Sequence, residues 1–127
     1  MMRMLLLLAA MFGFTGVALG AFAAHGLKTQ LSADYLAVFQ TGVHHQMLHA
    51  LALLALAALW ERLAQRLLLA AGICFCVGIL LFSGSLYALT LSGIGALGVI
   101  TPVGGLMFLV GWACLGLAAW RLPVRAG

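Results

Sequence analysis

Three histidines and one glutamine, side chains that could bind a metal or move a proton, lie close together in the sequence at His44, His45, Gln46 and His49. The stretch around them, residues 36–60, is otherwise almost wholly apolar. Ionisable side chains inside a membrane span are costly, and they usually face a protein interior or a water-filled cavity. The cluster is therefore the first candidate for a functional site.

A metal or haem site is one interpretation of the cluster. At 100° per residue, His45 and His49 share one face of a helix, whereas His44 points to the other side of His45. Two histidines are too few ligands, because structural zinc uses four protein ligands and catalytic zinc usually three. His25 could complete a set only if the fold brought it close, and one helix cannot offer two histidines to opposite faces of a haem iron. We therefore expect no metal and no cofactor.

Two further interpretations of the cluster stay open. Histidines titrate near neutral pH, so they suit a path for protons or a small polar solute. Transporters of that kind usually add carboxylates within the membrane, but Asp34 and Glu61 both lie at the ends of apolar runs. The simpler interpretation is hydrogen bonding between helices, at about 0.6 and up to about 2 kcal/mol per bond. The expected partners are hydroxyl groups in the third apolar run, at Ser83, Ser85, Tyr87 and Thr90. Ser83 and Tyr87 are four residues apart and so share one helix face.

The composition predicts a lipid environment. The chain is 66% hydrophobic and 6% charged, whereas an ordinary soluble domain has about 25% charged residues. Its six Lys and Arg residues are scattered singly, so they form no basic patch of the kind that binds nucleic acid. The cysteines, Cys74, Cys76 and Cys114, lie in apolar runs, where we interpret them as small buried apolar residues.

Four long apolar runs are present, at Met4–Ala24, Leu36–Trp60, Leu67–Leu91 and Pro102–Trp120. About 20 residues of helix cross a hydrocarbon core of about 30 Å. The runs are continuous and do not alternate, which favours helices over a β-barrel. The first run is also longer than the apolar part of a signal peptide, so we expect it to be a retained helix. We predict an all-α, integral membrane four-helix bundle that forms a single domain over residues 1–127.

Capping residues mark the expected ends of these helices. Gly26 is expected to end the first helix in the left-handed conformation that glycine tolerates. Ser32 is expected to cap the start of the second helix, and Asp34 places a negative charge in its first turn. Thr101 and Pro102 are the expected N-cap and first residue of the fourth helix.

Small residues recur at spacings that let helices approach closely. They repeat every four residues in the first run and every seven in the fourth. The predicted packing positions are Gly16, Gly20, Gly104, Gly105 and Gly111. The same seams could also join two copies of the chain in a homo-oligomer.

The basic residues predict an orientation. Five of them lie at the N-terminus, in the second connection and at the C-terminus, namely Arg3, Arg62, Arg66, Arg121 and Arg125. The first connection contains only Lys28, and the third contains none. Since short cytoplasmic segments carry an excess of Lys and Arg, both termini are predicted to be cytoplasmic.

Four segments together resemble the bacterial membrane family called domain of unknown function 423, which is related to the eukaryotic transmembrane protein 256. They are Leu19–Phe22 with His25, Gln40–Gly42 with Gln46 and His49, Phe82–Tyr87, and Thr101–Gly105 with Gly111 and Trp112. The resemblance implies a four-helix protein of the bacterial plasma (inner) membrane, without an established activity. It also implies a set of matched polar positions at His25, Gln46, His49, Ser83, Ser85, Tyr87 and Thr101. At His45 an aromatic residue, usually tyrosine, is expected in the family, which weakens a metal pair with His49.

These observations predict a small membrane protein that is not an enzyme, since no nucleophile–base pair is apparent. We expect an accessory or assembly partner of larger membrane complexes, in which the matched polar side chains form a pocket that opens outward. The alternative is a carrier or channel for a proton or small polar solute through the region of His49. The expected partners are the lipid bilayer and either another membrane protein or a second copy of the chain.

Overall fold

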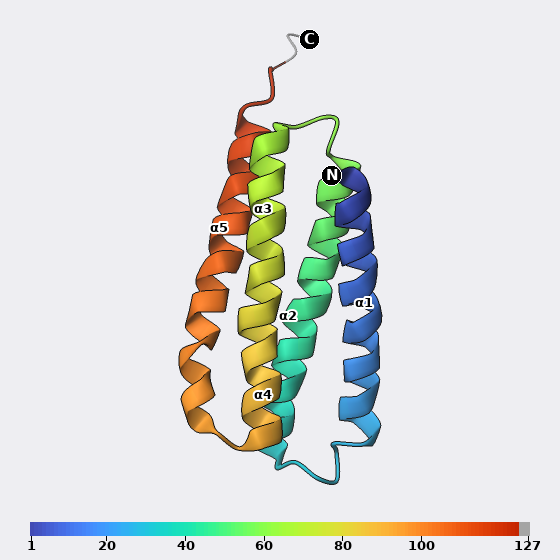
Figure 1. Cartoon of the computed structure of the whole chain (residues 1–127), viewed down its shortest axis with the longest axis vertical. Coiled ribbons are helices and arrows are strands. Elements are labelled where there is room, and N and C mark those ends of the chain that lie inside the picture. The colour runs from blue at the N-terminus through green and yellow to red at the C-terminus, as the bar shows by residue number, and fades with distance from the viewer. Residues whose placement is uncertain (125–127) are drawn as a thin grey trace.

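The computed structural model describes residues 1–124, which fold into long antiparallel helices (Figure 1). In chain order the elements are α1 (Met2–His25), α2 (Ala33–Ala58), α3 (Gln65–Gly78), the π-helical segment η1 (Ile79–Ser83), α4 (Gly84–Ser92), the 3-10 segment η2 (Gly95–Val99) and α5 (Thr101–Trp120). Because α3, η1 and α4 follow one another without a break, they form one rod. The predicted all-α four-helix bundle is therefore confirmed.

Three helical stretches are long and apolar enough to cross a membrane, at Met2–His25, Gln65–Ser92 and Gly95–Trp120. Helix α2 has a similar length of 26 residues but is not one of these stretches, and it contains three histidines and two glutamines. Gln46 and His49 are buried inside the bundle, whereas Leu51 on the same helix is exposed. Helix α2 thus lies beside α1 with Gln46 and His49 turned inward.

The helix ends agree with the predicted caps at one position and differ at two. Ser32 caps α2 as expected, since its Oγ accepts a hydrogen bond from the Tyr35 N–H at 3.2 Å. Gly26 was expected to be left-handed, but its φ is −75° because the chain continues into a turn that ends in Ser32. The left-handed glycine is Gly93, with φ 74°, at the end of α4. Thr101 is the first residue of α5 and not its cap, which leaves its hydroxyl available to another helix.

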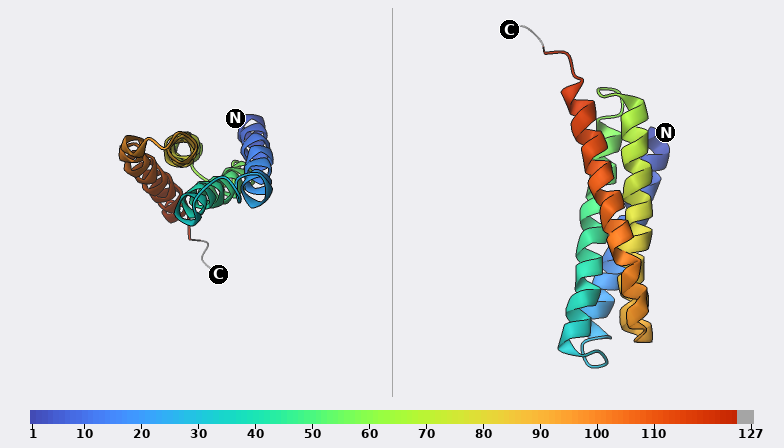
Figure 2. Two further views of the ribbon diagram at one scale, coloured as in Figure 1. Left: turned by 90° about the horizontal axis from the view of Figure 1, so that it is seen from below. Right: turned by 90° about the vertical axis from the view of Figure 1, so that its left-hand side faces the viewer.

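The helices pack as two pairs that are joined through α2. Helix α1 lies against α2, and α3 lies against α5 (Figure 2). Helix α2 also contacts α3, η1 and α4, so it connects the two pairs. The main core lies between them and includes the fully buried side chains of Leu53, Leu56, Leu68 and Phe75. A smaller cluster around Phe39 closes the end near the α1–α2 connection.

The glycines of α1 form a contact surface for α2. A Cβ atom on Gly16 would collide with the side chain of Met47. A Cβ on Gly20 would lie 3.3 Å from Cγ1 of Val43, which is also tight. The seam on α1 is therefore filled by α2, and a second copy of the chain would have to use another face.

The glycines of α5 bring it against α3 and η1. A Cβ on Gly104 would collide with the backbone of Phe82, and one on Gly111 would lie 2.5 Å from the ring of Phe75. At Gly105 the nearest atom of Phe82 is 3.8 Å away, which is ordinary van der Waals contact. Gly104 and Gly111 therefore permit the close approach of α5, whereas Gly105 is not required for it.

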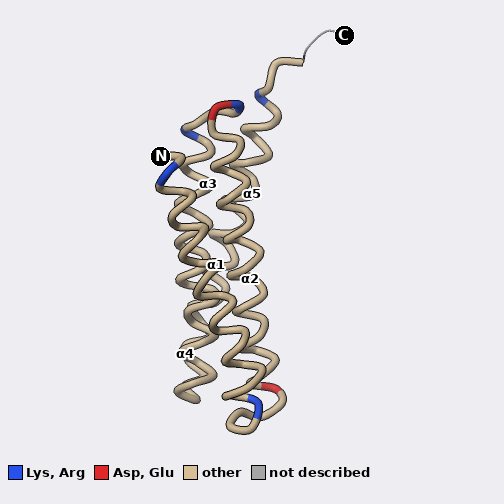
Figure 3. The backbone as a smooth tube through the Cα atoms, turned by 90° about the vertical axis from the view of Figure 1, so that its right-hand side faces the viewer, with Lys and Arg blue, Asp and Glu red and all other residues tan. Residues whose placement is uncertain are grey.

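The charged residues lie at the two ends of the bundle (Figure 3). The end with the N-terminus holds Arg3, Glu61, Arg62, Arg66 and Arg121, and the opposite end holds Lys28 and Asp34. Arg125, which also entered the predicted orientation, lies outside the described residues. The excess of arginine at one end fits the predicted orientation, and the cytoplasmic location of the termini stays a prediction.

We predict that Gly104→Ala destabilises the bundle, because the new methyl group meets backbone and not a movable side chain. Overpacking of this kind typically costs about 1–3 kcal/mol. Gly116→Ala is the matched control, since it lies on the same helix with nothing within 4 Å of its Cβ position. Thermal unfolding of both variants in detergent measures the difference. Equal melting temperatures for the two would contradict the close approach of α5.

Candidate functional site

Gln46 joins three helices through its side-chain amide. Its Nε2 donates to the backbone carbonyl of Phe12 at 2.9 Å and to Oγ1 of Thr15 at 2.8 Å, both on α1. Its Oε1 accepts from the hydroxyl of Tyr87 on α4 at 2.7 Å. Gln46 is only 3% exposed. Both hydrogens of its amide are used in the two bonds to α1. A buried amide with these partners has no unpaired donor.

A second contact between α2 and the rod of α3, η1 and α4 lies beside Gln46. The fully buried hydroxyl of Ser83 donates to the backbone carbonyl of Gly42 at 2.6 Å. A Cβ atom on Gly42 would lie 2.8 Å from the ring of Tyr87, so only glycine leaves space for that ring. Ser83 ends the π-helical segment and Tyr87 lies one turn further on, and both contact α2. Gly42 thus provides both an acceptor for Ser83 and room for Tyr87.

Ser85 and Thr101 form a separate pair that joins α4 to the start of α5. Their hydroxyl oxygens are 2.6 Å apart. Ser85 also donates its one hydroxyl hydrogen to the carbonyl of Phe82 at 2.9 Å. Because a carbonyl can only accept, Thr101 must be the donor toward Ser85. This pair lies between α4 and α5, whereas Gln46 connects α1, α2 and α4.

His49 is 2% exposed and hydrogen-bonds through both ring nitrogens. Nδ1 lies 2.8 Å from the carbonyl of His45, and Nε1 of Trp112 on α5 lies 3.0 Å from Nε2. A carbonyl only accepts and an indole N–H only donates, so Nδ1 carries the hydrogen and Nε2 accepts. The ring also lies flat on Phe108, with ring centroids 3.6 Å apart and planes at 6°. These contacts fix His49 as one neutral tautomer.

His45 differs from His49 in its surroundings. Its ring packs against Phe82 with centroids 4.6 Å apart, and its plane is 15° from that of His49 at 6.2 Å. Its Nδ1 is the one buried side-chain nitrogen or oxygen without a hydrogen-bond partner among residues 1–124. The pair shares a helix face as the spacing predicts, but both nitrogens of His49 already have protein partners. Within the described part of the chain, no three metal-binding side chains come together.

Of the seven predicted polar positions, His25 does not join the others. It is the last residue of α1 and is exposed, and its side chain makes no hydrogen bond to any described residue. The other six make hydrogen bonds between helices, at Gln46, His49, Ser83, Ser85, Tyr87 and Thr101. Two bonds join members of this set, Gln46 to Tyr87 and Ser85 to Thr101, while Ser83 bonds the Gly42 backbone and His49 bonds Trp112. The arrangement is a hydrogen-bonded core and differs from the expected open pocket.

Thr15 and Trp112 belong to this core but were not predicted as site residues. Thr15 is the only polar side chain within the first apolar run, so its isolation was an available signal. Trp112 lies near the middle of the fourth run, whereas tryptophan in membrane proteins gathers at the interfaces. A mid-membrane indole needs an acceptor for its N–H, which is the role of His49 here.

The fold and its polar core define a multi-pass helical membrane protein. A family model described as "Protein of unknown function (DUF423)" matches residues 19–105, and the chain belongs to this family. The matched region contains the six interhelical polar residues but neither Thr15 nor Trp112. The predicted family is therefore confirmed.

Relatives match along almost the whole chain. A "UPF0382 membrane protein" of Haemophilus influenzae is 46% identical over 118 residues, which are 91% of this chain and 93% of the relative. "UPF0382 membrane protein YwdK" of Bacillus subtilis is 42% identical, with 93% and 97% covered. "UPF0382 inner membrane protein YgdD" of Escherichia coli is 42% identical, with 94% and 92% covered. The predicted location in the bacterial inner membrane is confirmed, and no solved structure matches the chain.

We predict that Tyr87→Phe lowers the free energy of unfolding by about 0.6–2 kcal/mol, because Oε1 of Gln46 loses its donor. Tyr35→Phe is the control, since the Tyr35 hydroxyl makes no hydrogen bond to the described residues. Reversible unfolding in mixed detergent micelles gives both values. An unchanged stability for Tyr87→Phe would mean that this bond contributes nothing to the core.

Proposed function

We propose that this small membrane protein is a non-catalytic accessory or assembly partner of larger membrane complexes. In this proposal the polar core is structural and holds the four helices in one fixed arrangement. The observation that carries the proposal is the state of His49, whose two ring nitrogens are both occupied by protein groups. A side chain with no free donor or acceptor is a poor ligand for a solute.

The geometry around His49 also opposes a role in proton transfer. Protonation of Nε2 would place two donors, the imidazolium and the indole of Trp112, against each other. Rotation of the ring would break its stacking with Phe108, at 3.6 Å, and its bond to the His45 carbonyl. A proton relay needs a group that exchanges partners, whereas these contacts favour a single arrangement.

The outer surface of α1 supports a role in assembly. This helix packs on α2, while much of its remaining surface is apolar and exposed, as at Phe14. Nothing lies within 4 Å of the position that a Cβ atom on Gly13 would occupy. Small residues of this kind let a neighbouring membrane helix approach closely. We therefore assign the partner contact to the face of α1 that contains Gly13.

The alternative function, a carrier or channel for a proton or small polar solute, is favoured by His45. Its buried Nδ1 has no partner and lies on the same helix face as His49. In this alternative, His45 would bind the solute first. His49 would then give up its hydrogen bond from Trp112 and bind the solute in its place. A flux measurement separates the two functions.

The purified protein in liposomes with an internal pH-sensitive dye tests these functions. The accessory proposal predicts proton flux equal to that of protein-free liposomes, under an imposed gradient, for both the wild type and His49→Ala. Flux through the wild type that His49→Ala abolishes, while the variant stays folded by circular dichroism, would establish the carrier instead.

Assembly is tested by chemical cross-linking in cells, followed by native separation of the membrane extract. The wild type is expected in a complex larger than its own monomer and dimer. Gly13→Phe should reduce that complex without lowering thermal stability, because its side chain points to open space. A wild type that separates only as monomer after cross-linking would overturn the assembly role.

A further inference from the structure

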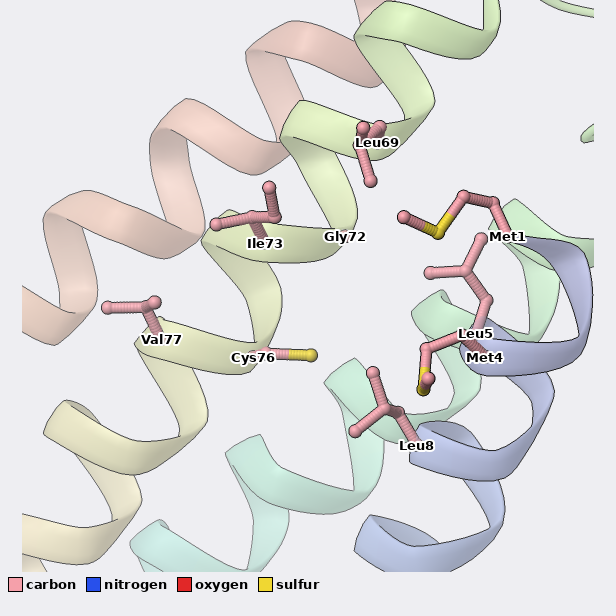
Figure 4. Close-up of a pocket in the computed structure, with 9 residues that line it drawn as sticks. All are labelled: Met1, Met4, Leu5, Leu8, Leu69, Gly72, Ile73, Cys76 and Val77. Carbon is pink, nitrogen blue, oxygen red and sulfur yellow. The ribbon is translucent and has the colours of Figure 1, made fainter.

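An apolar groove lies between the first turns of α1 and the stretch of α3 from Leu69 to Val77 (Figure 4). Its volume is about 320 Å³. The side chains around it present only carbon and sulfur atoms, and they include Met1, Met4, Ile73 and Cys76. Unbranched methionine side chains adapt readily to the shape of a flexible apolar ligand. The groove has no part in the polar core and does not bear on the proposed accessory function.

The groove exists because α1 and α3 both pack on α2 and meet each other mainly at one point. Leu5 is buried against Gly72, where a Cβ atom would lie 2.8 Å from Cδ2 of the leucine. On the outer side of this contact, the side chains of Met4 and Ile73 are 54% and 55% exposed. Leu5 and Gly72 thus form a floor, and the more exposed side chains form the walls.

The length of the groove distinguishes between occupants. On α3 it runs from Leu69 to Val77, about 12 Å along the helix axis at 1.5 Å per residue. This is less than half of a hydrocarbon core of about 30 Å. A neighbouring membrane helix would contact α1 and α3 across both leaflets, whereas one acyl chain of a lipid occupies one leaflet only. The groove therefore fits a lipid chain better than a partner helix.

A basic side chain continues the groove toward the membrane surface. Arg66 precedes Leu69 by three residues and Ile73 by seven, so all three lie on one stripe of α3. Arg66 is exposed in the first turn of that helix. This end of the bundle also has more arginine than acid (Figure 3). Guanidinium groups bind phosphate with paired hydrogen bonds, and anionic lipids gather at basic membrane-proximal segments.

We infer that the groove between α1 and α3 binds one acyl chain of an anionic phospholipid whose phosphate contacts Arg66. The predicted orientation places this lipid in the cytoplasmic leaflet. Apolar contact with the groove holds the chain, and charge selects the headgroup. The site therefore requires both parts, and each part can be removed separately.

Native mass spectrometry of the purified full chain, titrated with dioleoyl phosphatidylglycerol or dioleoyl phosphatidylcholine, tests the inference. We expect one molecule of phosphatidylglycerol to bind more tightly than phosphatidylcholine. Arg66→Gln should weaken phosphatidylglycerol binding about fivefold and leave phosphatidylcholine unchanged. Arg66→Lys should restore most of the affinity, because the charge is kept.

Matched variants separate this site from general lipid contact. Ile73→Trp should fill the groove and weaken the binding of both lipids, whereas Leu80→Trp, at another exposed position outside the groove, should have no effect. Arg121→Gln removes a charge at the same end of the bundle, on α5, and should also have no effect. Circular dichroism verifies that each variant is folded.

Three results would overturn the inference. Equal affinity of the wild type for the two lipids would show that Arg66 makes no selective contact with an anionic headgroup. An equal effect of Arg66→Gln and Arg121→Gln would indicate diffuse attraction without a site. A shift of the wild type to dimer that Ile73→Trp abolishes would identify a second copy of the chain as the occupant.

Discussion

The hydrogen bonds of Gln46 set how the two halves of the bundle are rotated against each other around the apolar core that they share. Helix α1 relies on α2 for its packing, and the rod of α3, η1 and α4 packs on both α5 and α2. The amide of Gln46 reaches α1 on one side and Tyr87 on the other. Lipid offers no alternative partners for these polar atoms, so each must be satisfied within the chain. This requirement fixes the depth and rotation of α1 and α4 relative to α2.

The glycines and aromatic rings of the bundle follow from the same requirement. Gly42 makes room for the Tyr87 ring, without which the hydroxyl could not reach Gln46. Gly104 belongs to α5 and lets this helix approach the backbone of η1 at Phe82. This approach positions Phe108 and Trp112 of α5 against His49. Apolar residues alone would not specify these rotations, because lipid and protein interiors are equally apolar.

Much of the architecture could be predicted from the sequence, because continuous apolar runs leave few alternatives in a membrane. Helical spacing also placed Ser83 and Tyr87 on one face, and both contact α2. The hydrogen bonds that Thr15 and Trp112 make could not be predicted by the same means, because they depend on how separate helices rotate against each other. The right-handed Gly26 and the π-helical segment likewise depend on packing in three dimensions. His25 matched the family pattern, but its position at the end of α1 keeps it away from the core.

The intramembrane polar groups form a structural core in which His49 has one fixed, neutral state. The most direct test is nitrogen-15 NMR of histidine-labelled protein in lipid bilayers, with His49 assigned by its loss in His49→Ala. We expect a protonated Nδ1 and an unprotonated Nε2 that accepts a hydrogen bond, and Trp112→Phe should shift the Nε2 resonance toward the value of a free acceptor. A spectrum of His49 with the hydrogen on Nε2, or with both tautomers in exchange, would contradict this fixed state.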